Sequence, residues 1–324
     1  MTHHEKCLQT LTSHHSCFPH VINLAVQAIY AALKDGKGLE EQCQLENDAT
    51  LGGVALPEGV TRSSYLSALK ADVLGTARKL VATCRISGKR REEFVDTVLD
   101  GNSNETWVDG DGNPMSRKAL QLLRDCETRW SSTYNLVDRV LTMLPVSFSI
   151  TDIWLLQLSS LQVIEVFAKR PSQSGANITI PNTAEVCVLD HVRVVMLVPH
   201  LAQESLSSQR TPTLSYSLPF YHSIIDQWGG LKQTYPLLSP YIVVGIKKVE
   251  EYVGKSKHSQ TYLLAVCKSL FSFQVVSMLT PWLPVLNPCL KIGWIEKNCS
   301  VDDVQRAIQM VLHAVSPTSY GCRS

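Results

Sequence analysis

The sequence lacks a marked excess of charge of either sign. Its 324 residues include 30 basic and 29 acidic side chains, which gives a formal net charge of +1 at neutral pH. A dedicated DNA-binding domain is usually strongly basic, so a nucleic-acid surface in this chain has to be a local patch. The hydrophobic fraction of 44% is ordinary for a globular protein and predicts one large or two small cores.

Paired cysteines are also lacking. The ten cysteines include no Cys-x-x-Cys spacing, which argues against a zinc ribbon or a dithiol redox site. The first ten residues contain no apolar core, so we expect no secretory leader and reduced thiols in a cytosolic or nuclear compartment. The sequence has no glycine-rich phosphate loop, Gly-x-Ser-x-Gly or His-Glu-x-x-His, which argues against the enzyme classes that carry these motifs.

Long apolar runs are scarce, with one exception. Residues 269–286 carry no charge, and 18 residues is the lower limit for a membrane span. Pro281 and Pro284, together with polar side chains inside the run, weaken that interpretation. We therefore expect no membrane partner.

What the sequence does contain is apolar residues at helical spacing. The predicted helices cover residues 20–34, 63–86, 87–99, 116–144 as one helix or two, 185–206 with an interruption at Pro199, 219–231, a stretch from Pro236 or Pro240 to 253, and 302–315. Ser87 is positioned to cap the helix that follows it. Pro19 predicts extended backbone before it. Few segments have strand character, so the expected fold class is mainly α.

A short motif near the start combines a thiol and an imidazole, Cys17-Phe-Pro-His20. A structural metal site needs about four ligands, and no second Cys/His pair of matching spacing follows. The alternative is a buried thiol and a histidine at a helix start, where the imidazole accepts from a backbone N–H. Residues 109–113 open like a calcium loop, but proline and leucine occupy the required glycine and glutamate positions. We therefore predict no bound metal.

A second motif surrounds Trp130 in the stretch RDCETRWSSTY. Asp125 and Glu127 are two apart, so on a helix they would point to different sides, and we expect them to pair in solvent with Arg124 and Arg129. Tryptophan is more often a core residue than a ligand contact. An indole can also stack on an unpaired base, a contribution of roughly 1–3 kcal/mol in single-strand binders.

A third feature is the local basic cluster Arg85-x-x-x-Lys89-Arg90-Arg91. Such a cluster can contact phosphates and release counterions. Glu92 and Glu93 follow directly, which favours the alternative of a solvated helix start whose charges are neutralised locally.

Six stretches, taken in order, resemble the hAT superfamily of DNA transposases, especially the type common in fungi. They are CFPHVINLAVQAI (17–29), LVATCRISGKRREEF (80–94), LLRDCETRWSSTYNLVDRVL (122–141), TPTLSYSLP (211–219), GIKKVEEYV (245–253) and LNPCLKIGWIEKNC (286–299). Together they extend over most of the chain.

The resemblance implies a ribonuclease H-like α/β core split by a large helical insertion. In that family three acidic residues bind Mg²⁺ or Mn²⁺ for attack on the DNA backbone. Cys17 and His20 match the family's Cys-x-x-His motif beside the DNA, and Arg129 and Trp130 match its Arg-Trp motif, in which the tryptophan supports a flipped base. The DNA-binding residues expected from the resemblance and from the basic cluster are Cys17, His20, Lys89, Arg90, Arg91, Arg129 and Trp130.

The sequence also departs from the family. Both catalytic aspartates should precede the Cys-x-x-His motif, and none of the sixteen residues before Cys17 is Asp. The third acid and the dimerisation segment should follow the insertion. We therefore expect a truncated remnant without catalytic activity or cofactor, with residues 1–145 as a partial core and the start of the insertion and residues 146–324 as the insertion domain.

Three further expectations complete this interpretation. Weak DNA binding predicts a nuclear location, and self-association is expected to suffer from the missing dimerisation segment. Residues 267–285 differ in sequence character from their neighbours, and we interpret them as translated intron sequence. One rival interpretation is an active transposase subunit whose acidic residues are supplied by another chain. A second is a helical protein–protein interaction module with no role on DNA.

Overall fold

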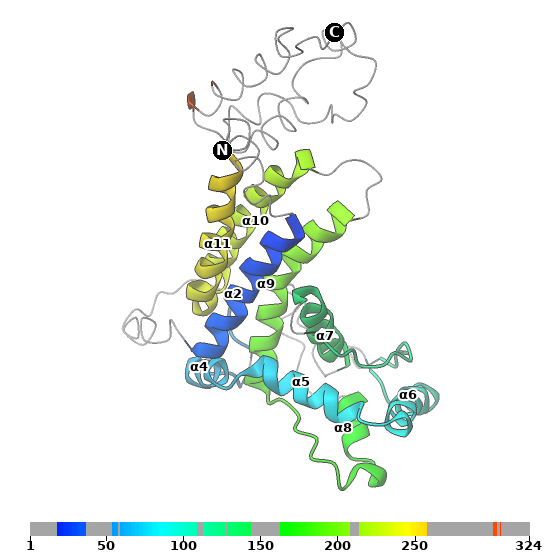
Figure 1. Ribbon diagram of the computed structural model, residues 1–324. Helices are drawn as coiled ribbons and strands as arrows, with labels where there is room; N and C mark the ends of the chain where they lie inside the picture. The colour runs from blue at the N-terminus through cyan, green and yellow to red at the C-terminus, as the bar shows by residue number, and fades with distance from the viewer. Residues whose placement is uncertain are drawn as a thin grey trace, which may run out of the picture. The chain divides into compact units, whose positions relative to one another are not determined.

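The computed structural model describes residues 18–36, 54–57, 59–108, 113–126, 129–143, 163–207, 214–257, 301–302 and 305 (Figure 1). The helices, in chain order, are α2 (Phe18–Asp35), α4 (Arg62–Lys70), α5 (Val73–Cys84), α6 (Gly88–Ser103), α7 (Trp130–Met143), α8 (Val163–Ala168), α9 (Thr183–Ser207), α10 (Leu214–Thr234) and α11 (Ser239–Lys257). Two 3₁₀ turns, η2 (Pro171–Gln173) and η3 (Pro236–Leu238), precede α9 and α11. The expectation of a mainly helical chain is confirmed, and the described residues form isolated bridges but no strand.

The chain divides into two compact units, and four of the helices contribute to both. One unit contains residues up to Ala25, Leu201–Gly229 and everything from Gly245 onward. Within it, the Phe18 ring at the start of α2 stacks on Tyr221 of α10 with centroids 4.9 Å apart. Phe18 also meets Phe220 edge-on at 6.2 Å, so aromatic packing fixes α2 to α10 in this unit.

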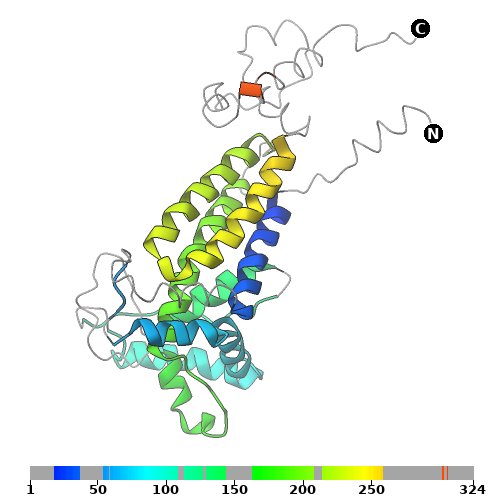
Figure 2. The same cartoon turned by 90° about the vertical axis from the view of Figure 1, so that its left-hand side faces the viewer.

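The other unit contains Val26–His200 and Gly230–Val244. Here α5 packs on α6 and α7, while α6 packs on α8. Phe94 of α6 meets Phe167 of α8 edge-on at 5.2 Å, and both rings are buried. Figure 1 shows α6 running in a different direction from α5, and residues 86–89 at the turn between them are exposed. Figure 2 shows the same helices turned by 90°.

The single helix predicted for residues 63–86 is wrong in one respect, because it breaks between Ala71 and Asp72. Asp72 has a φ of 23°, and its carboxylate accepts a hydrogen bond from the backbone N–H of Gly75 at 3.0 Å. This carboxylate therefore begins α5 as an N-cap. The apolar residues keep their helical spacing through this break. The spacing therefore predicted which faces of α4 and α5 are buried, but not the change of helix axis between them.

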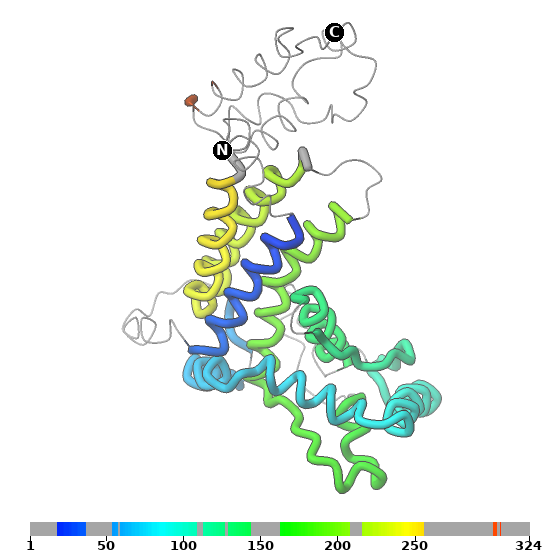
Figure 3. Tube along the Cα trace, viewed as in Figure 1, coloured from blue at the N-terminus to red at the C-terminus, as the bar shows by residue number. Residues whose placement is uncertain are grey.

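The helix predicted for residues 116–144 begins much later, at Trp130. Residues 115–125 are neither helical nor paired as a strand, and Figure 3 traces them as an extended path between α6 and α7. Side chains from neighbouring helices take up their backbone groups. Asn102 bonds both the N–H and the C=O of Arg117 at 2.8 Å, and Arg139 donates to the carbonyl of Gln121 at 2.7 Å. These bonds replace the helical ones.

The proline signals were also only partly right. The helix α2 begins at Phe18, before Pro19, because proline is tolerated in the first turn of a helix. Pro199 and Pro219 lie inside α9 and α10 and do not interrupt them. A proline inside a helix costs about 3 kcal/mol. This cost is offset by the burial of apolar side chains that precede and follow the proline in the helix. In α9 that burial comes from Val192, Val195 and Met196 before the proline and from Ala202 and Leu206 after it.

Within the described ranges, no helix has both the length and the apolarity that crossing a bilayer requires. The uncharged run 269–286, the stretch interpreted as intron sequence and most of the predicted helix 302–315 lie outside the described residues.

Candidate nucleic-acid interface

The start of α6 is the most basic helix terminus in the described structure. Ser87 caps it as predicted, because its hydroxyl accepts from the backbone N–H of Arg90 at 3.2 Å. The first turn then carries Lys89, Arg90 and Arg91 and no acidic residue. A helix N-terminus favours negative charge, so three cations here are electrostatically unfavourable until an anion joins them.

The three predicted cations of this turn have different roles. Arg90 Nη1 donates to the carbonyl of Thr83 at 3.0 Å, near the end of α5, and so ties the two helices together. Lys89 is exposed and Arg91 half-exposed. Neither forms an ion pair with a carboxylate among the residues that the structure describes. Lys89 and Arg91 are therefore the residues of this turn that can contact an anion.

Arg85, at the end of α5, connects this turn to the extended path before α7. Its Nη1 donates to the carbonyl of Leu122 and to Oε1 of Gln121, the latter at 3.1 Å. This contact brings Arg124 into the same neighbourhood. Burial lowers the pKa of Arg85, and the charges of Arg91 and Arg124 lower it further. We define Arg85, Lys89, Arg91 and Arg124 as the basic cluster.

Glu92 and Glu93 were expected to neutralise the start of α6, but Glu93 bonds to another part of the chain. Glu93 accepts hydrogen bonds from Ser172 and from the Gln173 amide, the latter at 2.7 Å. It therefore faces the η2 turn, 80 residues later in the chain. Glu92 is exposed and pairs with no cation within the described part. Glu92 and Glu93 therefore do not fully neutralise the positive charge at the start of α6.

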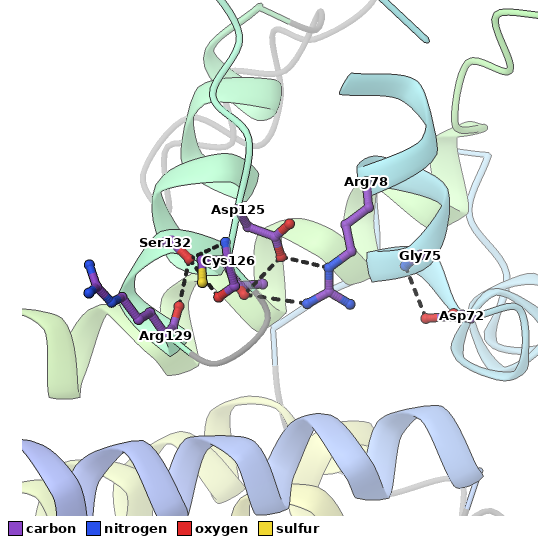
Figure 4. A network of polar contacts seen from close by, with 8 residues as sticks. Asp72, Gly75, Arg78, Asp125, Cys126, Arg129 and Ser132 are labelled. Atoms are coloured by element: carbon purple, nitrogen blue, oxygen red, sulfur yellow. Dashed lines mark hydrogen bonds and ion pairs between the residues drawn. The ribbon is translucent and has the colours of Figure 1, made fainter. Parts of the chain in front are cut away.

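Asp125 is held by a partner that the sequence analysis did not expect. Its Oδ2 accepts from Arg78 Nε at 2.6 Å and from the Thr133 hydroxyl at 3.2 Å (Figure 4). Its side chain is only 10% exposed, so the pairing in solvent with Arg124 or Arg129 is wrong for Asp125. This ion pair anchors the end of the extended path to α5, and Glu127 lies outside the described residues.

Ser132 organises the turn that leads into α7. Its hydroxyl accepts from the backbone N–H of Cys126 at 2.7 Å and lies 2.6 Å from the carbonyl of Arg129 and 3.0 Å from that of Cys126. The single hydroxyl proton serves one of these carbonyls at a time. The exposed Arg129 side chain points away from Arg78 and Asp125 in Figure 4.

Trp130 is the first residue of α7 and a core residue. It is 2% exposed and meets the His200 ring of α9 edge-on at 6.4 Å. The same imidazole stacks on Tyr134 at 4.2 Å, one turn further along α7. In this arrangement the indole has no face open to a base, so a stacking role would require Trp130 to leave the core.

The remaining predicted residues lie in the other unit. His20 is exposed on the first turns of α2, which differs from the buried environment of Phe18 beside it. Cys17 lies outside the described residues. The structure therefore brings Arg91, which shares a helix turn with Lys89, close to Arg85 and Arg124, and it places His20 in a separate unit. Arg124 was missed because its relation to α6 is set by a side-chain contact far away in sequence.

No family model, no curated protein and no solved structure matches this chain.

The divalent metal that the resemblance implies requires a cluster of carboxylate or other ligands. Among the described residues, no three His, Cys, Asp or Glu side chains gather closely enough to hold an ion. The largely buried carboxylates of Asp125 and Asp190 are each paired with an arginine, Arg78 and Arg193 respectively. The described residues therefore do not fit a two-metal centre.

Proposed function

We propose that this chain is a helical protein of hAT-transposase type that holds nucleic acid by its phosphate backbone through the basic cluster. The six stretches of family resemblance, which occur in order along the chain, support this origin. Such an origin implies a ribonuclease H-like core. The observation that carries the binding proposal is the gathering of Arg85, Arg91 and Arg124 near one capped helix terminus, without a carboxylate paired to them among the described residues. Phosphodiester cleavage is not part of the proposal.

The geometry favours a phosphate over a carboxylate-bearing partner for a physical reason. A phosphate at the start of α6 meets the positive end of the helix dipole and the Lys89 and Arg91 side chains together. Its charge also relieves the repulsion between Arg85, Arg91 and Arg124. A backbone with regularly spaced phosphates can satisfy the helix start and Arg124 at once.

The expected binding is sequence-independent and sensitive to salt. Each phosphate contact contributes about −0.9 to the slope of log K against log salt for duplex DNA. Replacing Lys89, Arg91 and Arg124 by glutamine should therefore make the slope less negative by about 3 and weaken binding at low salt. Arg85 is left unchanged, because its contact with Leu122 is structural.

The experiment is fluorescence anisotropy with a labelled duplex across a salt series, using the whole chain. The matched control replaces three exposed or half-exposed cations outside the cluster, Lys70, Lys232 and Lys247, and so removes the same charge. Lys70 precedes α5 and Arg85 follows it, a helix about 18 Å long, so that site is well separated. Equal losses in the two triple variants, or no binding at low salt, would contradict the proposal.

A second candidate function is supported by apolar exposure next to the same cations. Ile86 is 68% exposed beside Arg85, and Leu123 is 37% exposed beside Arg124. Apolar contacts bordered by positive charge suit an acidic amphipathic helix of a protein partner. Replacing Ile86 by serine separates the two candidates: it should leave DNA binding unchanged and should abolish binding of such a helix.

A nuclear location follows from the proposed DNA partner and is part of the same proposal. Self-association is left to measurement by size-exclusion chromatography of the same samples.

A further inference from the structure

A cavity of about 160 Å³ lies in the unit that contains α4, away from the basic cluster. Its wall combines three aromatic rings, those of Tyr65, His191 and Tyr235, with the apolar side chains of Leu56 and Pro236 and a single cation, Arg62. An apolar cavity of about this volume holds one six-membered ring. The cavity therefore has the size and lining for a small monocyclic ligand.

The aromatic wall is held in place from several elements. The Tyr65 hydroxyl of α4 lies 2.9 Å from Nδ1 of His191 on α9, and the His191 ring packs on Tyr235 at 4.4 Å. Nε2 of His191 lies 3.7 Å from the Cys187 sulfur. Both imidazole nitrogens are thus engaged within the protein, and burial lowers the pKa of His191 to about 4, so the ring is neutral at physiological pH. The backbone N–H of Val54 donates to the carbonyl of Thr234 at 2.9 Å and closes one side.

Arg62 is the unusual member of the wall. Its Nε is buried and has no hydrogen-bond partner. A buried N–H without a partner is destabilising, and more so when the group is charged. Arg62 is also the first residue of α4, whose first turn contains no acidic residue, so its charge stands at the helix end that favours an anion.

Among the residues that the structure describes, no aspartate or glutamate contributes to the cavity wall. Asp190 acts on the Tyr65 phenol from a distance, but both Nε and Nη2 of Arg193 bind its Oδ1, at 3.0 and 2.7 Å. The described wall of the cavity is therefore aromatic, with one cation, Arg62, and no carboxylate to pair with it.

We propose that this cavity binds a small aromatic carboxylate, with the ring against the Tyr65, His191 and Tyr235 wall and the carboxylate paired with Arg62. A carboxylate matches the planar fork of a guanidinium and supplies the missing acceptor. This inference does not depend on the proposed nucleic-acid function.

The test is an isothermal titration of the whole chain with sodium benzoate, compared with benzyl alcohol, which has a similar shape and no charge. Benzoate should bind saturably, and benzyl alcohol should bind at least tenfold more weakly. A charge-assisted hydrogen bond contributes about 1.5–3 kcal/mol, so Arg62→Met should weaken benzoate binding by roughly tenfold or more. The same variant should leave the affinity for benzyl alcohol within about twofold of the wild-type value.

The matched control is Lys70→Met, which removes one cation at the other end of the same helix and should keep benzoate affinity within twofold. Arg62→Lys keeps the charge but not the fork and should give an intermediate affinity. Circular dichroism establishes that each variant is folded. The triple variant of Lys89, Arg91 and Arg124 should bind benzoate normally, so failure of one proposal does not imply failure of the other. Absence of saturable binding up to about 10 mM benzoate, or equal affinity in Arg62→Met, would overturn the inference.

Discussion

Replacing Gly101 by alanine is expected to destabilise the protein, although the position lies inside a helix where alanine is normally the better residue. Gly101 belongs to α6, and a Cβ built on it would stand 2.1 Å from Cζ2 and 2.2 Å from Cε2 of Trp107. Carbon atoms in ordinary contact are separated by about 3.5–4.0 Å. The indole would have to move by more than an ångström.

Trp107 has little freedom to make that movement. The side chain is fully buried, and its Nε1 donates to the carbonyl of Val98 at 3.1 Å. Overpacking a core costs about 1–3 kcal/mol. An indole N–H left buried without its acceptor costs about 1–3 kcal/mol more. Alanine regains about 1 kcal/mol of helix propensity. The expected net loss in the free energy of unfolding is about 1–5 kcal/mol.

The measurement is urea denaturation followed by far-ultraviolet circular dichroism, with hydrogen exchange at the Val98 amide as a local readout. Gly230→Ala is the control, because this exposed helical glycine has no atom within 4 Å of the added Cβ. It should stabilise by about 0.5–1 kcal/mol. In a Trp107→Phe background the Gly101→Ala penalty should shrink, because the atoms that clash are absent. If Gly101→Ala instead stabilises as much as the control does, the packing argument is wrong.

Three further predictions follow from buried polar groups. Asp125→Asn should lower the free energy of unfolding by roughly 1–3 kcal/mol, because it removes the charge paired with Arg78 and loosens the turn before α7. Burial lowers the pKa of His191 to about 4. The unfolded chain then binds the extra proton between about pH 6.5 and pH 4, so stability should fall with falling pH across that window, by on the order of 3 kcal/mol in total. Burial raises the pKa of the Cys187 thiol to about 12, so iodoacetamide at pH 8 should label exposed Cys126 and spare Cys187 until the protein unfolds.

Each of these has its own control. Glu165→Gln breaks the exposed pair with Lys169, whose side chains are 31% and 65% exposed, and should change stability by less than about 0.5 kcal/mol. Between about pH 6.5 and pH 4, the free energy of unfolding should change less with pH in His191→Gln than in the wild type. An unchanged pH dependence would show that His191 is not its cause. Peptide mapping by mass spectrometry reads the labelling, and Cys84, also buried with a pKa raised to about 12, should be spared like Cys187. Rapid labelling of both thiols in the folded chain would contradict the burial argument.

The sequence by itself determined the helical class and several helix starts. The 3.6-residue apolar spacing depends only on neighbours along the chain, which is why it located the starts of α2, α4, α6 and α11 to within a few residues. Ser87 was recognised as a cap for the same reason, since its hydrogen bond reaches only three residues ahead.

The tertiary structure decided where that local pattern ends. Residues 115–125 have helical spacing, but Asn102, Arg85 and Arg139 take their backbone groups and hold them extended. Asp125 had two basic neighbours in sequence and is bound by Arg78, 47 residues away. Side-chain contacts over such separations leave no periodic signal.

The candidate sites show the same division. Lys89 and Arg91 could be named from sequence because they are adjacent in one helix turn. The approach of Arg124 to them, the burial of Trp130 against His200 and the cavity beside Arg62 each join segments distant in the chain. Charge density is a property of neighbouring residues, whereas burial and enclosure are properties of the packed core, and only folding brings their parts together.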